Sequence, residues 1–322
     1  MANKDELEKA LVQLRRIEEH RTAEAEKEIR RLYKSTLKDL KQFIAYEYAE
    51  YAEDGKLTYE ILQKHGRHAR FLEEVEQRMS GLSPEMSKEI KGLVEESYKL
   101  SYEGMIEAVK KSENSEELAE ALVGLRGTTP ESIQAIVEKG LVDDVLKKNW
   151  QAHVYEIKRN IAIGLAVGDR LDTVAKRISK AVDTDYKKAL VIARTESSRA
   201  REAGFCNSAI DINDTLRQGV TQVRMTKRWV TMRDERVRPN IRRKTKKGWK
   251  TYKGTGANHQ IMDGVLIEAD EMFILSDGHE TLAPKQSGIA GQDINCRCKA
   301  VYRLMSDQEF YNATGRHFKG LD

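Results

Sequence analysis

A stretch near the N-terminus, from residue 5 to about residue 52, contains neither glycine nor proline. Apolar residues recur within it mostly at steps of three and four, at Leu7, Leu11, Leu14, Ile17, Ala25, Ile29, Leu32, Leu37, Leu40 and Ile44. Because a repeat of 3.6 residues places such side chains on one face, the pattern predicts a single long amphipathic helix. Its apolar face needs a partner, which we expect to be another helix of this chain, with a second copy of the chain as the alternative.

Helix boundary signals follow this stretch at regular intervals. Asp54-Gly55 is typical of a turn, Thr58 is a suitable N-cap for a helix to about Met79, and Ser83-Pro84-Glu85 and Thr129-Pro130-Glu131 are both typical of helix starts. Further helices are predicted at residues 90–109, 116–125, 142–167, 171–178 and 186–210, with Gly168 ending the helix at 167. The N-terminal region is therefore predicted to be an all-helical layer.

The pattern changes after residue 213, where short alternating segments predict β-strands. Apolar residues alternate at 223–231, 265–267 and 298–304, residues 272–275 form a short apolar run, and glycine becomes frequent. We therefore predict a mainly α protein with long N-terminal helices and an α+β C-terminal domain, which contains a small, loop-rich mixed sheet near the C-terminus. The expected division is a helical region at 1–140, an α+β domain at 141–305 and a C-terminal tail at 306–322.

Composition narrows the class of protein. Only 39% of the 322 residues are hydrophobic and 34% are charged, which is typical of long solvated helices. No run of 18 apolar residues occurs and the first residues are charged, so we expect neither a membrane span nor a secretory leader. The three cysteines, Cys206, Cys296 and Cys298, are an odd number in a long chain, and we expect reduced thiols rather than a disulfide framework.

Positive charge is concentrated in one segment. Residues 224–253 hold 13 Lys and Arg against two acids, whereas the whole chain carries a net charge of only +4. Three aromatic residues, Trp229, Trp249 and Tyr252, lie among these cations. The density favours contact with nucleic acid phosphates, with an anionic protein surface or simple solubility as alternatives. We expect a basic loop between two strands, and the DNA-binding residues predicted from it are Arg236, Arg238, Arg242, Arg243, Lys244, Lys246, Lys247 and Lys250.

The sequence contains few candidates for chemistry. Cys296 and Cys298 share one face of a predicted strand, and with His259 or His279 they offer three zinc ligands. We expect these thiols to pack without a metal and the protein to need no cofactor, with a zinc ion at His259, Cys296 and Cys298 as the alternative. Glu196 is expected to form an ion pair that anchors its helix to the strands. No catalytic residue is predicted, because the sequence lacks a P-loop, GxGxxG, HExxH or GxSxG motif.

An ordered set of short motifs resembles the phage Mu protein F-like minor head proteins, also called head morphogenesis proteins. The resemblance covers about residues 150–305 and rests on Arg194, Thr195, Glu196, Trp229, Asp234, Arg236, His259, Asp263, Gly264, Asn295, Cys296, Arg297 and Cys298. The chain departs from the family pattern where residues 239–258 intervene between two motifs. It also has Gln292-Asp293-Ile294 where many relatives have a histidine, and it lacks a CxxC after Asp234.

The resemblance implies a non-enzymatic minor capsid protein of a tailed bacteriophage, which lies inside the head near the portal vertex. It implies the portal protein and a scaffold or major capsid protein as partners. The basic loop adds the expectation that double-stranded DNA is contacted without sequence preference during packaging or ejection. The expected location is the virion, after assembly in the host cytoplasm, with no membrane in the assembled head. The rival hypothesis is a metal-assisted hydrolase or transferase that uses Glu196, His259 and the cysteine pair. A third is an assembly chaperone that leaves before maturation.

Overall fold

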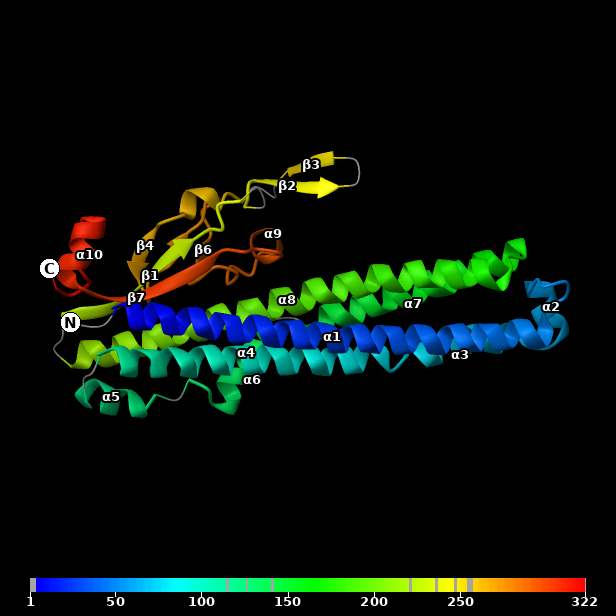
Figure 1. The fold of residues 1–322 in the computed structure, drawn as a ribbon, viewed down its shortest axis with the longest axis horizontal. Coiled ribbons are helices and arrows are strands. Elements are labelled where there is room, and N and C mark those ends of the chain that lie inside the picture. Colours follow the sequence, from blue (N-terminus) through cyan, green and yellow to red (C-terminus); the bar gives the residue numbers. More distant parts are fainter. Residues whose placement is uncertain are drawn as a thin grey trace. The chain divides into compact units, whose positions relative to one another are not determined.

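The computed structural model describes residues 4–113, 116–125, 127–139, 142–219, 222–234, 237–245, 248–253 and 257–321. At residues 4–5, 113, 116–118, 143, 240–245 and 249–253 it describes the backbone alone. The helices that precede the first strand are α1 (Lys4–Tyr51), α2 (Tyr59–Lys64), α3 (His68–Met79), α4 (Leu82–Glu113), α5 (Glu116–Val123), α6 (Pro130–Lys139), α7 (Val142–Val167) and α8 (Leu171–Gln218) (Figure 1). None of the helices in these described ranges is long and apolar enough to cross a membrane.

Strands and short helices alternate in the C-terminal part. They are β1 (Val223–Val230), β2 (Asn240–Thr245), β3 (Gly248–Lys253), η1 (Gln260–Met262), β4 (Leu266–Glu268), β5 (Phe273–Ile274), β6 (Glu280–Thr281), α9 (Ala290–Asp293), β7 (Lys299–Ser306) and α10 (Asp307–Thr314). The expected fold class, mainly α with an α+β C-terminal domain, is confirmed. The expectation of a mixed sheet is wrong, because every strand pair in the described part of the chain is antiparallel.

Local signals account for several helix ends. Helix α7 has the predicted bounds, and Gly168 follows it with a φ of +65° that other residues rarely adopt. The Thr58 hydroxyl accepts a hydrogen bond from Ile61 N at 3.3 Å and so caps α2 as expected. The helix expected to continue to Met79 is divided into α2 and α3, because Gly66 between them adopts a φ of +65°.

A single helix, α8, occupies the region in which the sequence predicted two helices. The sequence indicated separate helices at 171–178 and 186–210, but the chain stays helical through both. No glycine or proline occurs between Leu171 and Ala203 to end the helix. Asp185, in the polar segment between the two predicted helices, accepts a hydrogen bond of 2.5 Å from the Tyr33 hydroxyl of α1. A contact from a distant part of the chain thus holds a segment that resembled a turn.

The residues fall into two compact units whose segments alternate along the chain. The first comprises Met1–Arg21, Val94–Gly140 and Arg194–Asp322, and the second comprises Thr22–Leu93 and Leu141–Ala193. These units do not coincide with the ranges 1–140, 141–305 and 306–322 expected from the sequence, because long helices contribute to both.

The second unit is a helical layer with an aromatic and polar core. Tyr33 packs edge-on against Tyr186 with ring centroids 5.6 Å apart, and the Tyr48 hydroxyl donates to Asp169 O at 2.8 Å. Phe43 and Phe71 pack 5.4 Å apart. The long N-terminal helix therefore packs on helices of the same chain, as expected.

The first unit holds the α+β part of the chain, built on the three-stranded sheet β4-β1-β7 (Figure 1). Strand β1 pairs along its length with β7, with Lys227 opposite Tyr302, and on its other edge with β4. The Asn213 side chain of α8 both donates to and accepts from the backbone of Met225, at 3.0 and 2.5 Å. These contacts fix the helix to the central strand.

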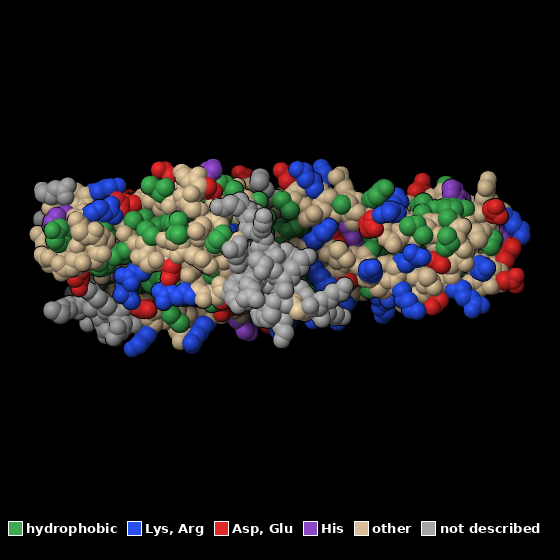
Figure 2. All heavy atoms as spheres, turned by 90° about the horizontal axis from the view of Figure 1, so that it is seen from above, with side chains coloured by type: hydrophobic (Ala, Val, Ile, Leu, Met, Phe, Trp, Pro, Cys, Tyr) green, Lys and Arg blue, Asp and Glu red, His purple; other side chains and the backbone are tan. Residues whose placement is uncertain are grey.

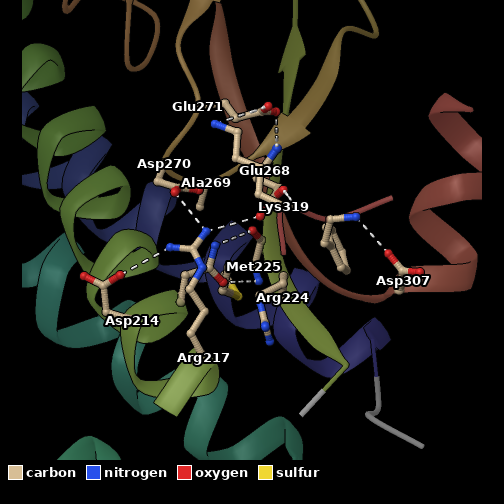
Figure 3. Close-up of polar contacts among 12 residues, drawn as sticks. Asp214, Arg217, Arg224, Met225, Glu268, Ala269, Asp270, Glu271, Asp307 and Lys319 are labelled. Atoms are coloured by element: carbon tan, nitrogen blue, oxygen red, sulfur yellow. Dashed lines mark hydrogen bonds and ion pairs between the residues drawn. The ribbon is translucent and has the colours of Figure 1, made fainter. Parts of the chain in front are cut away.

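The last residues pack on the sheet. Ser306 and Glu309 form a capping box at the start of α10, and Phe310 stacks on Phe318 at 4.5 Å. Figure 3 shows how Arg217, at the end of α8, bonds to Asp270 at 2.8 Å and to Glu268 at 3.2 Å. Glu268 in turn accepts from Lys319 N at 2.8 Å.

Candidate functional site

Four of the family motif residues, Trp229, His259, Cys296 and Cys298, meet in one small core beside the sheet. Trp229 of β1 is 1% exposed and packs edge-on against His259 and Phe273, with centroids 5.5 and 5.2 Å away. The same cluster contains Met262, Ile267, Leu275, Cys296 and Cys298. The strands here are short, and the cluster provides an apolar core for the surrounding loops.

Asp263 and Gly264 shape the turn that leads into β4. Asp263 accepts hydrogen bonds from Thr231 N at 2.8 Å and from Arg233 Nε at 2.7 Å. The backbone bond from Thr231 holds the pKa of Asp263 below its usual value. Gly264 adopts a φ of +89° and donates its N–H to Trp229 O at 2.8 Å. These two motif residues therefore have structural roles in the turn.

The fold brings His259 to both cysteines. His259 Nδ1 lies 3.5 Å from Cys296 Sγ and 3.5 Å from Cys298 Sγ. All three residues are buried, and their ligand atoms lie within 4.8 Å of one another. The hydrogen bond from Cys298 lowers the pKa of Cys296 against the effect of burial, whereas the same contact and burial raise the pKa of Cys298. The sequence anticipated this set but could not choose between His259 and His279, which is exposed.

A chain of polar groups fixes the orientation of the histidine. His259 Nε2 lies 2.7 Å from Gln292 Oε1, and Gln292 Nε2 donates to Asp277 Oδ2 at 2.5 Å. Because a carboxylate only accepts, the Gln292 amide nitrogen faces Asp277 and its oxygen faces the imidazole. Sequence reasoning gave no role to Gln292 or Asp277. The available signal was the position of Gln292 shortly before the Asn-Cys-Arg-Cys motif.

The other described motif residues lie outside the cysteine cluster. Glu196 is half-buried, which raises its pKa, and it pairs with Arg199 on its own helix at 2.9 Å. Arg199 also donates to Ile136 O at 2.7 Å, so the pair joins α8 to α6 and not, as expected, to a strand. Asp234 pairs with Arg297, the residue between the two cysteines in the sequence. Among the described acids and histidines, only His259 brings a ligand atom to the cysteine pair.

Other motif residues have ordinary backbone or surface positions. Arg194 is exposed and Thr195 is half-buried on α8, and Asn295 adopts a φ of +57° immediately before Cys296. Arg236 lies outside the described residues.

The basic segment is less uniformly exposed than its composition suggested. Lys227 is fully buried and donates to Ala269 O at 2.7 Å, and burial lowers its pKa. Arg224 is also buried, at 6% exposure. Arg238, expected to contact DNA, is 7% exposed and donates to Ile294 O at 2.6 Å. Burial and this backbone bond leave little of its side chain exposed.

The expected basic loop is a two-stranded ribbon. Strands β2 and β3 pair antiparallel, with Arg242 opposite Thr251, Arg243 opposite Lys250 and Lys244 opposite Trp249 (Figure 1). A chain that pairs with itself over this length is a hairpin rather than a loop between strands of the main sheet. Of the other expected DNA contacts, Lys246 and Lys247 lie outside the described residues, and the side chains of Arg242, Arg243, Lys244 and Lys250 are likewise not described.

A buried charge network in the first unit was not anticipated. Burial opposes ionisation of Glu202, yet Arg15 at 2.7 Å and Lys285 outweigh it and lower the pKa of Glu202 to about 2. Burial lowers the pKa of Lys285 to about 8. Arg15 also donates to Ala300 O at 2.7 Å and Glu202 accepts from Ala300 N at 3.1 Å. The network thus fixes α1 and α8 to strand β7.

The chain is similar to a protein family over part of its length and to individual proteins over most of it. Residues 155–251 match the family model described as Phage Mu protein F like protein. Over 304 residues the chain is 27% identical to minor head protein GP7 of Bacillus phage SPP1, and the match covers 93% of this chain and 86% of that protein.

A second relative carries an enzyme name. The chain is 24% identical over 305 residues to the NAD(+)–arginine ADP-ribosyltransferase EFV of Enterococcus faecalis, covering 92% of this chain but only 55% of that protein. No solved structure matches the chain. The matches agree with the resemblance that the motifs indicated.

Proposed function

Since the chain is a Mu F-like minor head protein of a tailed phage, we propose that it acts inside the head near the portal vertex and contacts the packaged DNA. The observation that carries the head assignment is similarity to a minor head protein along 93% of the chain. The DNA contact and the place near the portal are proposals that the following features support.

The β2–β3 ribbon is the proposed DNA contact. Its two strands and the two residues between them in the sequence carry the cations Arg242, Arg243, Lys244, Lys246, Lys247, Lys250 and Lys253. A two-stranded ribbon has a width that the major groove of B-DNA admits, and Lys and Arg supply the phosphate contacts. The register places Arg243 opposite Lys250. Like charges at opposed positions destabilise a ribbon in water, and an anionic partner removes that penalty.

An exposed apolar stripe on α7 is the proposed docking site for a head protein such as the portal. Tyr155, Ile163 and Val167 are 67%, 37% and 63% exposed and are separated by four or eight residues, so they share one helix face. Figure 2 shows such apolar patches among mixed acidic and basic side chains on the described surface. Clustered exposed apolar side chains mark protein interaction surfaces.

We propose no enzymatic role. Glu196, required by the hydrolase or transferase alternative, pairs with Arg199 and brings no ligand atom to the cysteine cluster. The activity in the name of the Enterococcus faecalis relative is not transferred, because this chain spans about half of that protein at 24% identity.

Neutralising the ribbon tests the DNA contact. Replacing Arg242, Arg243, Lys244, Lys246 and Lys247 with Gln should leave the circular dichroism spectrum unchanged and weaken binding to duplex DNA. The slope of log affinity against log salt should fall by about 4 to 5, roughly 0.9 for each phosphate that the variant no longer touches, on unrelated duplex sequences alike. Fluorescence anisotropy between about 50 and 200 mM salt measures this slope.

A matched variant controls for net charge. Replacing five exposed lysines of the helices, Lys34, Lys38, Lys99, Lys147 and Lys148, with Gln removes the same charge elsewhere and should leave most of the slope. An equal loss in both variants, an unchanged slope in the ribbon variant, or a wild-type chain that fails to bind duplex DNA at about 50 mM salt contradicts the proposal. The ribbon would then be assigned to a protein partner.

A further inference from the structure

The buried cluster of His259, Cys296 and Cys298 has the spacing of a metal centre. A zinc ion bonds sulfur at about 2.3 Å and nitrogen at about 2.0 Å, so tetrahedral geometry separates a sulfur and a nitrogen ligand by about 3.5 Å. Both cysteine sulfurs lie 3.5 Å from His259 Nδ1. The three side chains come from two loops more than 30 residues apart and are all buried.

A hydrogen-bonded cluster without a metal accounts for this geometry less well. The hydrogen bond to Gln292 Oε1 places the imidazole proton on Nε2, so Nδ1 faces the sulfurs with a single lone pair. One lone pair accepts one S–H well, yet two sulfurs approach it at the same distance. A metal cation placed between the two sulfurs and the nitrogen is bound by all three atoms together.

The surroundings have the features of an outer coordination shell. Metal-binding histidines almost always donate their second ring N–H to an oxygen that is itself held in place. Here His259 Nε2 faces the amide oxygen of Gln292, and Asp277 holds that amide through its nitrogen. The indole of Trp229 is buried, and its N–H lies beside the Cys298 sulfur and favours the thiolate. A metal-bound thiolate would accept a hydrogen bond from this N–H.

We propose that His259, Cys296 and Cys298 bind a zinc ion that stabilises the loop-rich core of the first unit. Two thiolates and one neutral imidazole balance the charge of Zn²⁺, which suits a buried position. No fourth described His, Cys, Asp or Glu reaches the cluster, so water completes the coordination. The ion connects the loop before β4 to the segment before β7, where strands of two to eight residues leave little other support.

Metal analysis of the full chain is the first test. Protein purified without chelator or added metal should contain about one zinc per chain. The double variant Cys296→Ser with Cys298→Ser should lose it, whereas Cys206→Ala, which changes the buried cysteine outside the cluster, should retain it. Zinc retained by the double variant, or a wild-type chain that takes up no zinc after incubation with Zn²⁺, overturns the proposal.

Two measurements keep the test informative if the double variant does not fold. Cobalt added to the chelator-treated wild-type chain should give thiolate-to-cobalt charge-transfer absorption that saturates at about one equivalent and disappears on adding zinc. Gln292→Met removes the oxygen that orients His259 and should weaken zinc binding roughly 10- to 100-fold. Cobalt binding without that absorption, or an unchanged zinc affinity in Gln292→Met, contradicts the proposed coordination.

Discussion

At the scale of single residues, buried charges control how the first unit responds to pH. Glu18 is 2% exposed and accepts a hydrogen bond from Ser101, with Arg201 Nε at 3.3 Å. Burial nevertheless raises the pKa of Glu18 to about 7, because these partners do not fully replace water. Glu202, on another helix of the same network, has its pKa lowered to about 2 by its closer cation.

The raised pKa of Glu18 predicts a stability that falls as pH rises. The folded chain holds the proton more tightly than the unfolded chain, so stability is lost between about pH 4.5 and pH 7, by up to about 3 kcal/mol. Glu18→Gln should remove this share of the pH dependence, measured by urea denaturation at pH 5 and pH 7. Its exposed neighbour provides the control Glu19→Gln, and equal pH profiles for the two variants would contradict the assignment.

At the scale of elements, close packing of α8 against α4 in the first unit depends on a glycine. A Cβ atom at Gly204 would lie 2.6 Å from Tyr98 O and 2.8 Å from Ser101 Cβ. Backbone atoms cannot move away as a flexible side chain does, so the helices would have to separate. The sequence marked neither this contact nor its partner helix, because nothing in a local pattern distinguishes a glycine at a helix crossing from one on a surface.

Gly204→Ala should therefore destabilise the chain by about 1 to 3 kcal/mol. The matched control is Gly92→Ala in α4, where a Cβ has no atom within 4 Å and alanine should stabilise the helix by roughly 0.5 to 1 kcal/mol. Denaturant unfolding of both variants measures the difference. A Gly204→Ala variant as stable as Gly92→Ala would show that the helices do not approach each other this closely.

Elements whose ends depend on nearby residues could be predicted from the sequence, whereas elements that depend on distant contacts could not. Helix α7 was predicted with correct bounds because Gly168 ends it. Helix α8 was divided wrongly because the contact that stabilises Asp185 comes from Tyr33, far away in the sequence. The cysteine pair was recognisable, but its histidine partner depends on two loops meeting. The hairpin at 240–253 differs from the predicted loop because its many cations obscured the strand pattern.

At the scale of the whole molecule, the chain combines a helical framework with a small sheet domain and a basic ribbon. Mixed surface charge and an apolar stripe on α7 suit a protein that docks to other head components. The ribbon suits a polyanion, and the buried cysteine and histidine core suits a structural ion. These features belong to one chain whose similarity to a minor head protein extends over 93% of its length.

The composition of purified proheads and virions from the phage that encodes this chain tests the head assignment most directly. Mass spectrometry should detect the chain in both preparations, together with the portal and major capsid proteins. Absence of the chain from both preparations, with those two proteins detected, would contradict the assignment.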